Sequence, residues 1–300
     1  MEDPIQPQAV PLGNEKVDEF LGTEGVYLLP HHKEEIERLQ RQHQFIKAAA
    51  NDKLTPVDLP EGARVLDSGC ADGTWLADLG KVHYGQSAKT FSLHGIDLGS
   101  TLFRKEPHLD LRKHDTRTPV PSSWGWKNSF DLVHQRLLVW GIGKDEWATV
   151  VSNLADLVKP GGTLQLVEAE WVLSSYADKA PQQKKLGQVQ EWSCDSSGMD
   201  VHIWKKFPAL LEGLGLEDVK VESFDLGYGV TSKRVEDRIW TAELLPQSFR
   251  HLARKMPDDA VANVAKTPEA YLQWLDELVA EMKAIGYTPK LKWFTARKPQ

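Results

Sequence analysis

An acidic residue followed by closely spaced small residues marks the stretch of this chain best suited to hold a ligand. Asp67 ends a short apolar run and is followed by Gly69, Ala71 and Gly73. Glycine adopts positive φ and has no Cβ, so the backbone of such a loop can lie against a ligand. A nicotinamide-type fingerprint would need G-x-G-x-x-G, but Thr74 stands at the last glycine position. The pattern therefore indicates a ligand-binding strand–turn–helix of another kind.

Further acids follow at the ends of later apolar runs. Asp97, with Leu98 after it, closes the second run, and an acid there can accept hydrogen bonds from both hydroxyls of a ribose. Asp115, followed by Thr116, lies where a third strand should end. Its carboxylate can accept from the exocyclic amine of adenine, while the next backbone N–H donates to the ring. Together these residues predict a nucleoside-binding site.

Candidates for the reacting side of the site come later in the chain. His134 lies near the end of a fourth apolar run and is the candidate catalytic residue, although a buried core histidine would look the same. Arg136 is expected to pair either with an acid of the fold, such as Glu168, or with a substrate. Acidic and aromatic residues are candidates for substrate contact, with core packing as the alternative for the aromatic ones: Glu168, Trp171, Trp192 and Tyr228.

The elements that must position these residues alternate between strands and helices over 62–170, which is typical of a parallel α/β sheet. An amphipathic helix is expected over 30–50, and Pro160-Gly161-Gly162 is expected to form a turn before the fifth strand. The second half of the chain is expected to contain a helix over 207–214, a strand over 215–224, helices over 231–254 and 267–285, and a last strand over 291–298.

Length and composition limit the classes of function. The 300 residues suit one large α/β domain with a cap, and the net charge of −7 argues against a nucleic-acid partner. No apolar run approaches the roughly 18 residues of a membrane span, and no signal-peptide pattern is present, so a cytoplasmic protein without a membrane partner is expected. Cys70 and Cys194 are expected to be reduced thiols, and no zinc-ligand spacing occurs, which predicts no metal.

The glycine loop resembles D-x-G-x-G-x-G, the cofactor loop of class I S-adenosylmethionine-dependent methyltransferases, with Ala71 in place of the middle glycine. The resemblance implies a Rossmann-like, seven-stranded, mainly parallel sheet with an antiparallel last strand and a helical cap. It also implies that the helix after the loop directs its positive end toward the methionine carboxylate of the cofactor. The residues expected to bind S-adenosylmethionine are Tyr27, Asp67, Gly69, Ala71, Gly73, Asp97, Leu98, Asp115, Thr116 and His134.

The segment upstream of the loop is similar to a fungal branch of this class that acts in secondary metabolism. The features shared with that branch are Tyr27, Pro30, the acids Glu34 and Glu35, Arg38-Leu39, His43 and the later His134-x-Arg136. The resemblance covers about residues 25–170. Within the branch, the chain also looks like the enzymes that methylate thiols of epidithiodiketopiperazine toxins such as gliotoxin.

We expect a flexible tail over 1–24, whose beginning is rich in Pro and Gln, lid helices over 25–60 and a methyltransferase domain over 61–300. Within that domain a cap insertion is expected over 171–205 and a helical insertion over 231–285. The expected reaction is S-methylation of a small metabolite dithiol, because a thiol ionises near a pKa of about 8.5 and needs no strong base. Alternatives are O- or N-methylation of another metabolite, or a regulatory protein of this fold that works through a protein partner.

Overall fold

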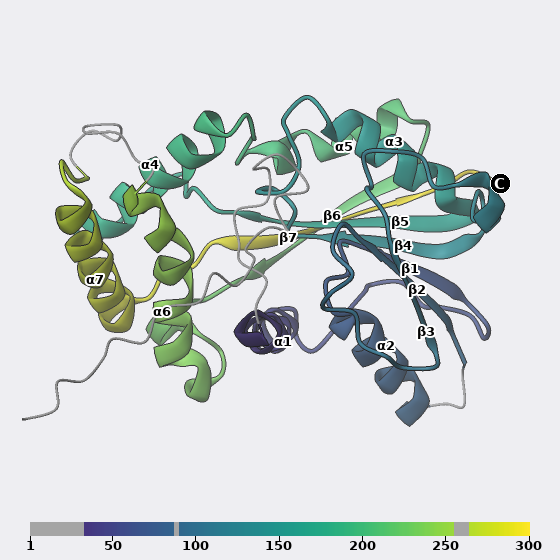
Figure 1. Cartoon of the computed structure of the whole chain (residues 1–300), viewed down its shortest axis with the longest axis horizontal. Coiled ribbons are helices and arrows are strands. Elements are labelled where there is room, and N and C mark those ends of the chain that lie inside the picture. The colour runs from purple at the N-terminus through teal and green to yellow at the C-terminus, as the bar shows by residue number, and fades with distance from the viewer. Residues whose placement is uncertain (1–32, 87–89, 255–263) are drawn as a thin grey trace, which may run out of the picture.

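The computed structural model describes residues 33–86, 90–254 and 264–300, and the strands in these ranges form one sheet (Figure 1). The strands are β1 (Arg64–Ser68), β2 (Ser92–Asp97), β3 (Leu109–Lys113), β4 (Phe130–Arg136), β5 (Val158–Glu170), β6 (Glu217–Asp225) and β7 (Lys290–Arg297). Their order across the sheet is β3-β2-β1-β4-β5-β7-β6. The first five pair in parallel, whereas β7 is antiparallel to both β5 and β6. The predicted Rossmann-like fold class is confirmed.

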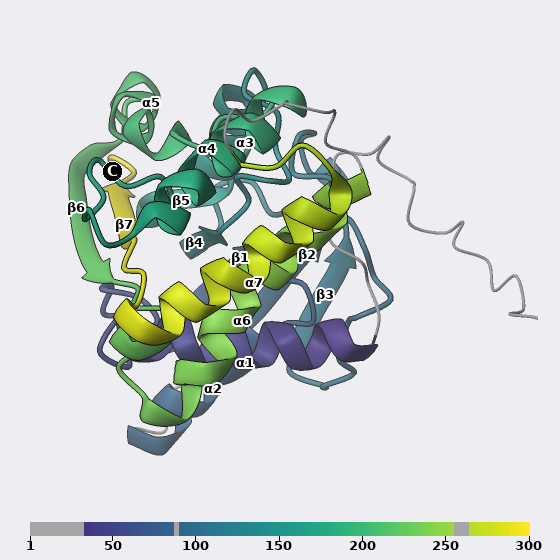
Figure 2. The same ribbon diagram turned by 90° about the vertical axis from the view of Figure 1, so that its left-hand side faces the viewer.

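Helices cover both faces of the sheet and one of its ends. They are α1 (Lys33–Ala49), α2 (Thr74–Gln86), α3 (Trp147–Leu157), α4 (Pro181–Ser196), α5 (Phe207–Gly213), α6 (Arg238–Phe249) and α7 (Pro268–Ile285). Figure 1 shows α1 and α2 on one face and α3 and α5 on the other. Figure 2 shows α6 and α7 crossing in front of the carboxyl ends of the parallel strands, with α4 above them and α1 below. This end of the sheet is therefore covered by helices from the second half of the chain.

The central strands are apolar on both sides because helices cover both of their faces. Val65 in β1 and Val133 in β4 are fully buried. Polar residues appear at the carboxyl ends of these strands, where Asp67 of β1 lies directly beside His134 of β4 in the parallel register. The sheet thereby brings two of the predicted site residues together, although they are far apart in sequence.

Two predicted elements differ from the structure. Pro160-Gly161-Gly162 does not form a separate turn, because β5 begins directly after α3 and contains these residues in its irregular first part. A Cβ at Gly162 would lie 2.8 Å from the carbonyl oxygen of Phe130, so β4 passes too close for a larger residue. The helix predicted over 231–254 begins only at Arg238, and its last part is a tighter turn, Arg250–Arg254.

The structure describes only part of the segments predicted as tail, lid and insertions. The tail over 1–24 and Tyr27 lie outside the described residues. The described part of the lid is α1, whose buried Phe45 and Ile46 pack in the core. The predicted cap contains α4, and the predicted helical insertion contains α6 and α7.

Candidate active site

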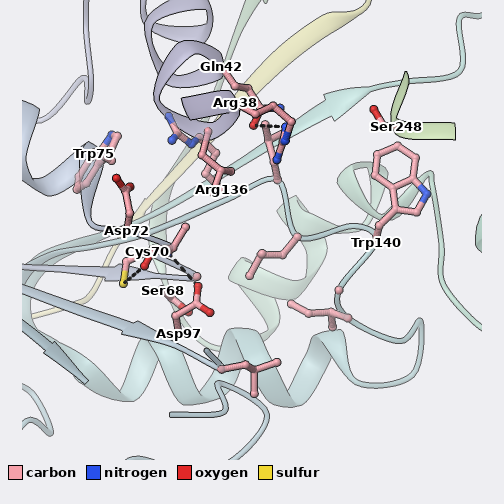
Figure 3. A pocket seen from close by; sticks show the side chains of 18 of the residues that line it. Arg38, Gln42, Ser68, Cys70, Asp72, Trp75, Asp97, Arg136, Trp140 and Ser248 are labelled. Atoms are coloured by element: carbon pink, nitrogen blue, oxygen red, sulfur yellow. Dashed lines mark hydrogen bonds between the residues drawn. The ribbon is translucent and has the colours of Figure 1, made fainter. Parts of the chain in front are cut away.

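A pocket opens at the carboxyl ends of β1 and β4, where the strand order of the parallel sheet reverses (Figure 3). In open α/β sheets this is where ligands bind. The predicted site residues that line the pocket are Asp67, Gly69, Ala71, Asp97, Leu98, Asp115, Thr116, Trp171 and Tyr228. Those that do not are Gly73, His134, Glu168 and Trp192. The predicted nucleoside half of the site is thus brought together, whereas the predicted acceptor half is brought together only in part.

The loop after β1 is fixed in a left-handed backbone by the end of β2. Gly69 and Ala71 have φ angles of 71° and 50°, a region that residues with a Cβ seldom adopt. The Ala71 N–H donates to Asp97 Oδ2 at 2.9 Å, and the Gly99 N–H donates to Asp97 Oδ1 at 3.0 Å. Burial raises the pKa of Asp97, although both N–H donors act in the opposite direction. Asp97 therefore joins two loops while its carboxylate faces the pocket.

Asp115 is oriented by hydrogen bonds from Arg117. The Arg117 guanidinium donates to Asp115 from Nε at 2.9 Å and from Nη2 at 2.8 Å, and the Arg117 backbone N–H donates as well. Although burial acts against it, these donors lower the pKa of Asp115. An ionised carboxylate keeps further lone pairs for a ligand. Asp115 is therefore an acceptor held at a fixed angle beside the pocket.

His134 is not among the residues that line the pocket, so its position does not support the prediction that it is catalytic. Its Nδ1–H donates to Asp67 Oδ1 at 2.8 Å, and its ring stacks on Trp75 with 3.9 Å between centroids. The side chain is 1% exposed, and burial lowers its pKa, so the ring is neutral. His134 therefore positions Asp67. Asp67 and Trp75 line the pocket, whereas His134 does not, so a ligand in the pocket would contact those two residues.

Glu168 is likewise a supporting residue and not a wall of the pocket. Its carboxylate accepts hydrogen bonds from the Val139 N–H at 3.1 Å, the Ala169 N–H at 3.0 Å and the Trp171 Nε1–H at 3.3 Å. Burial raises the pKa of Glu168 to about 7. The expected pairing with Arg136 is not formed. Glu168 joins the loop after β4 to Trp171, and both of these line the pocket.

Aromatic and aliphatic side chains, among them Trp140 in Figure 3, line a part of the pocket that we call the aromatic chamber. Trp140 lies 5.4 Å from Trp171 and 5.9 Å from Phe249, measured between ring centroids. The residues of the chamber are Leu138, Trp140, Ile142, Trp171, Ser193, Tyr228, Leu244, Leu245, Ser248, Phe249, His251 and Leu252. A few polar groups in an apolar wall orient a buried small molecule.

Two tryptophans of the predicted cap, Trp192 and Trp204, do not line the pocket. Trp192 packs against the core, and Trp204 lies under the ammonium groups of Lys205 and Lys292, at 5.4 Å and 4.6 Å from its ring. Sequence reasoning missed Trp140, although it lies in the loop after β4, where a residue can reach the carboxyl end of the sheet. It also missed the chamber residues of α6, for which the sequence carries no signal beyond an apolar helix.

A backbone N–H in the first turn of α2 already donates to a carboxylate of the chain itself, that of Asp72. Asp72 Oδ1 accepts the Thr74 N–H at 3.0 Å, and Asp72 Oδ2 accepts from Gln40 at 3.0 Å and from Arg104 Nη2 at 2.9 Å. A carboxylate at a helix N-terminus uses the positive end of the helix dipole. The predicted use of this helix end for the carboxylate of a ligand is therefore not supported.

The described residues contain neither a cluster of metal ligands nor a membrane-spanning helix. Within 33–86, 90–254 and 264–300, no group of three or more His, Cys, Asp or Glu side chains could hold a metal ion. No helix in this part of the chain is long and apolar enough to cross a membrane. Cys70 and Cys194 are both free thiols and both buried.

Comparison with known proteins adds relatives of similar length. No protein-family model matches the chain. It is 28% identical over 288 residues to N-methyltransferase sirN of Leptosphaeria maculans, covering 92% of this chain and 96% of the relative. It is also 28% identical over 296 residues to N-methyltransferase gliN of Aspergillus fumigatus, covering 92% and 98%. Both similarities extend over almost the whole chain.

One solved structure supports the fold independently. A protein described as a methyltransferase from an antibiotic biosynthesis pathway of Anabaena variabilis superposes with a TM-score of 0.55. It shares 12% sequence identity, and the match covers 85% of this chain and 96% of that chain. At this identity the likeness concerns the arrangement of the elements alone.

Proposed function

We propose that this chain, which is a class I methyltransferase dependent on S-adenosylmethionine, methylates a nitrogen atom of a small, ring-containing fungal secondary metabolite. The observation that carries the proposal is the continuity of the nucleoside half of the pocket with the aromatic chamber. The choice of nitrogen is supported by the names of the relatives sirN and gliN, each an N-methyltransferase. The fungal setting is supported by the organisms of these relatives.

The residues of the nucleoside half fit the cofactor. When bound, S-adenosylmethionine supplies an electrophilic methyl group on a sulfonium. Asp97 would accept hydrogen bonds from the ribose hydroxyls, and Asp115 would accept from the adenine amine. Asp67, held by His134, offers a carboxylate near the loop after β1, where the ammonium of the methionyl end needs an acceptor.

The aromatic chamber would hold the acceptor and change its ionisation. Transfer requires the nucleophile about 3–3.5 Å from the reacting carbon and in line with the leaving group, so most of the enzyme's contribution is positioning. Apolar surroundings disfavour charged groups, which favours an uncharged acceptor nitrogen, whether it belongs to an amine or to a ring amide N–H. The lone pair of the uncharged nitrogen would attack the methyl carbon, and the nitrogen would then lose its proton. Trp140, Trp171 and Phe249 would therefore exclude water and keep a nitrogen acceptor reactive.

S-methylation of a reduced epidithiodiketopiperazine is the second candidate. A thiol reacts as its thiolate, which an apolar chamber disfavours and a neighbouring cation favours. Burial raises the pKa of Cys194, which illustrates the unfavourable effect in this protein. Arg38 and Arg136 line the pocket, and their positive charges would favour a thiolate beside them. The two candidates differ in the acceptor atom and not in the fold or the cofactor.

A matched set of acceptors separates the two candidates. We would incubate the protein with S-adenosylmethionine and one diketopiperazine scaffold in three forms: the free dithiol, the cyclic disulfide and the bis-S-methylated compound, each with a free ring N–H. The position of the new methyl group is read by tandem mass spectrometry. Methylation at nitrogen, including in the bis-S-methylated form, supports the proposal. Product from the dithiol alone, methylated at sulfur, contradicts it, and so does the absence of any product while the cofactor binds.

A further inference from the structure

We propose that Arg136 binds the carboxylate of the methionyl end of S-adenosylmethionine, and that His43 with Asp78 is the pair that holds Arg136 in position. The inference concerns the cofactor and does not depend on which acceptor the enzyme methylates. Arg136 ends β4, His43 lies in α1 and Asp78 lies in α2, so three elements meet behind the pocket. Figure 3 shows Arg136 below Arg38 and Gln42, which extend from α1.

The half-buried Arg136 guanidinium lies at the pocket and has no ion-pair partner in the part of the chain that the structure describes. Among the residues that the structure describes, no carboxylate oxygen lies within 4.0 Å of its nitrogens. Asp67 and Asp72 act on it only from a greater distance. Burial lowers the pKa of Arg136, but a guanidinium remains charged in proteins. A cation that is partly removed from water without a bound anion is costly, so an anionic ligand group beside it would be favourable.

The bond to His43 fixes the direction of the guanidinium. Arg136 Nη1 lies 3.3 Å from His43 Nδ1, and His43 Nε2 lies 2.9 Å from Asp78 Oδ2. A guanidinium only donates hydrogen bonds and a carboxylate only accepts them. Both bonds form together only if His43 is neutral, with its proton on Nε2. The side chain of His43 is 0% exposed, so no water replaces either partner.

The charges around His43 support this neutral form. Asp78 of α2 accepts from Lys47 of α1 at 2.8 Å, and Arg136 of β4 faces the opposite ring nitrogen. Burial lowers the pKa of His43, and the hydrogen bond from His43 lowers the pKa of Asp78 to about 2. Asp78 therefore remains ionised, and His43 is neutral at neutral pH. Protonation of Nδ1 would place a donor against the guanidinium and displace Arg136.

The opposite charges of the pocket match an amino acid zwitterion. Arg136 and Asp67 both line it, which gives a cation for a carboxylate and an anion for an ammonium. The other expected anion site, the N-terminus of α2, already carries Asp72. Arg136 is thus the better-placed group for the carboxylate.

Cofactor analogues test the role of Arg136 without any acceptor. We would measure the binding of S-adenosylmethionine and of its decarboxylated analogue by calorimetry to wild type, Arg136→Gln and the control Arg112→Gln, whose guanidinium pairs with Asp110. Wild type and the control should bind S-adenosylmethionine about ten- to a hundredfold more tightly than its decarboxylated analogue, because the analogue lacks the carboxylate that forms a charged hydrogen-bond pair with Arg136. Arg136→Gln should lose most of this preference. Retention of the preference in Arg136→Gln, or equal weakening of both ligands, overturns the proposal.

Two substitutions test the role of His43. Glutamine can donate to Asp78 and accept from Arg136, so His43→Gln should keep the preference for the carboxylated ligand, whereas His43→Leu should lose it. The wild-type preference should be constant at higher pH and fall below about pH 6.5, where His43 begins to accept a proton, but it should not fall in His43→Gln. Thermal unfolding checks that each variant is folded. The same decline with pH in His43→Gln, or an unchanged preference in folded His43→Leu, would refute the positioning role.

Discussion

Replacing His134 by phenylalanine separates a positioning role from a catalytic one. Phenylalanine keeps a ring against Trp75 but removes the Nδ1–H that donates to Asp67 at 2.8 Å. Asp67 is 4% exposed, so water does not replace the lost donor. Leaving a buried acceptor without its partner costs about 1–3 kcal/mol, and we expect the free energy of unfolding to fall by that amount.

The same substitution should change the dependence of stability on pH. Burial lowers the pKa of His134 in the folded state, so below about pH 6.5 the unfolded chain binds more protons than the folded one. The stability that depends on the neutral ring is present above this pH and is lost as the pH falls. His134→Phe removes this contribution, and urea unfolding at several pH values measures it.

A matched control and a turnover assay complete the test. His94 makes a similar bond to Asp110, with Nδ1 3.1 Å from Oδ2, but it lies outside the pocket lining. His94→Phe should lower stability without changing the affinity for S-adenosylhomocysteine, whereas His134→Phe should weaken both. Removing a general base lowers turnover by about 10²- to 10⁴-fold. A loss of that size in His134→Phe, with stability and affinity unchanged, would show that our reasoning is wrong.

Two further predictions concern the two halves of the pocket. Asp97→Ala should weaken the binding of S-adenosylhomocysteine at least about tenfold in calorimetry, because two hydroxyl bonds to a carboxylate are lost; unchanged affinity would remove Asp97 from the ribose site. Trp140→Leu should raise the KM for the acceptor and leave the affinity for S-adenosylhomocysteine unchanged, because Trp140 belongs to the aromatic chamber. Trp204→Leu, outside that chamber, should change neither, and an equal effect of both substitutions would contradict the assignment.

The nucleoside half of the pocket was predictable because it depends on the parallel sheet. Asp67 and Asp97 each end a strand, and the carboxyl ends of parallel strands meet at one edge. Ala71 was predicted as a loop residue even without glycine, and its N–H bond to Asp97 explains how it keeps a positive φ. Because neighbouring strands pair in parallel and in a regular register, residues that end these strands in the sequence lie side by side in the structure.

The acceptor half was less predictable because it depends on how insertions pack. Trp171 lines the pocket, but Trp192 of α4 packs against the core, and sequence does not give the rotation of one helix relative to another. His134 lies outside the pocket lining for a related reason. Both faces of β4 are covered, so its sequence shows no alternation that would tell which polar side chain reaches the pocket. Phe249 depends in turn on the position of α6.

The division of the pocket between sheet and insertions has a consequence for how this enzyme can change. The residues proposed to bind the cofactor lie at strand ends and in the loops after them, whereas much of the proposed acceptor wall comes from α6 and the turn after it. Substitutions in distant, independent sites act additively. A lineage can therefore exchange residues such as Leu244 or Ser248 and acquire a new substrate without passing through a form that has lost its methyl donor. Diversification of acceptors around an unchanged cofactor site is the evolutionary path that this architecture leaves open.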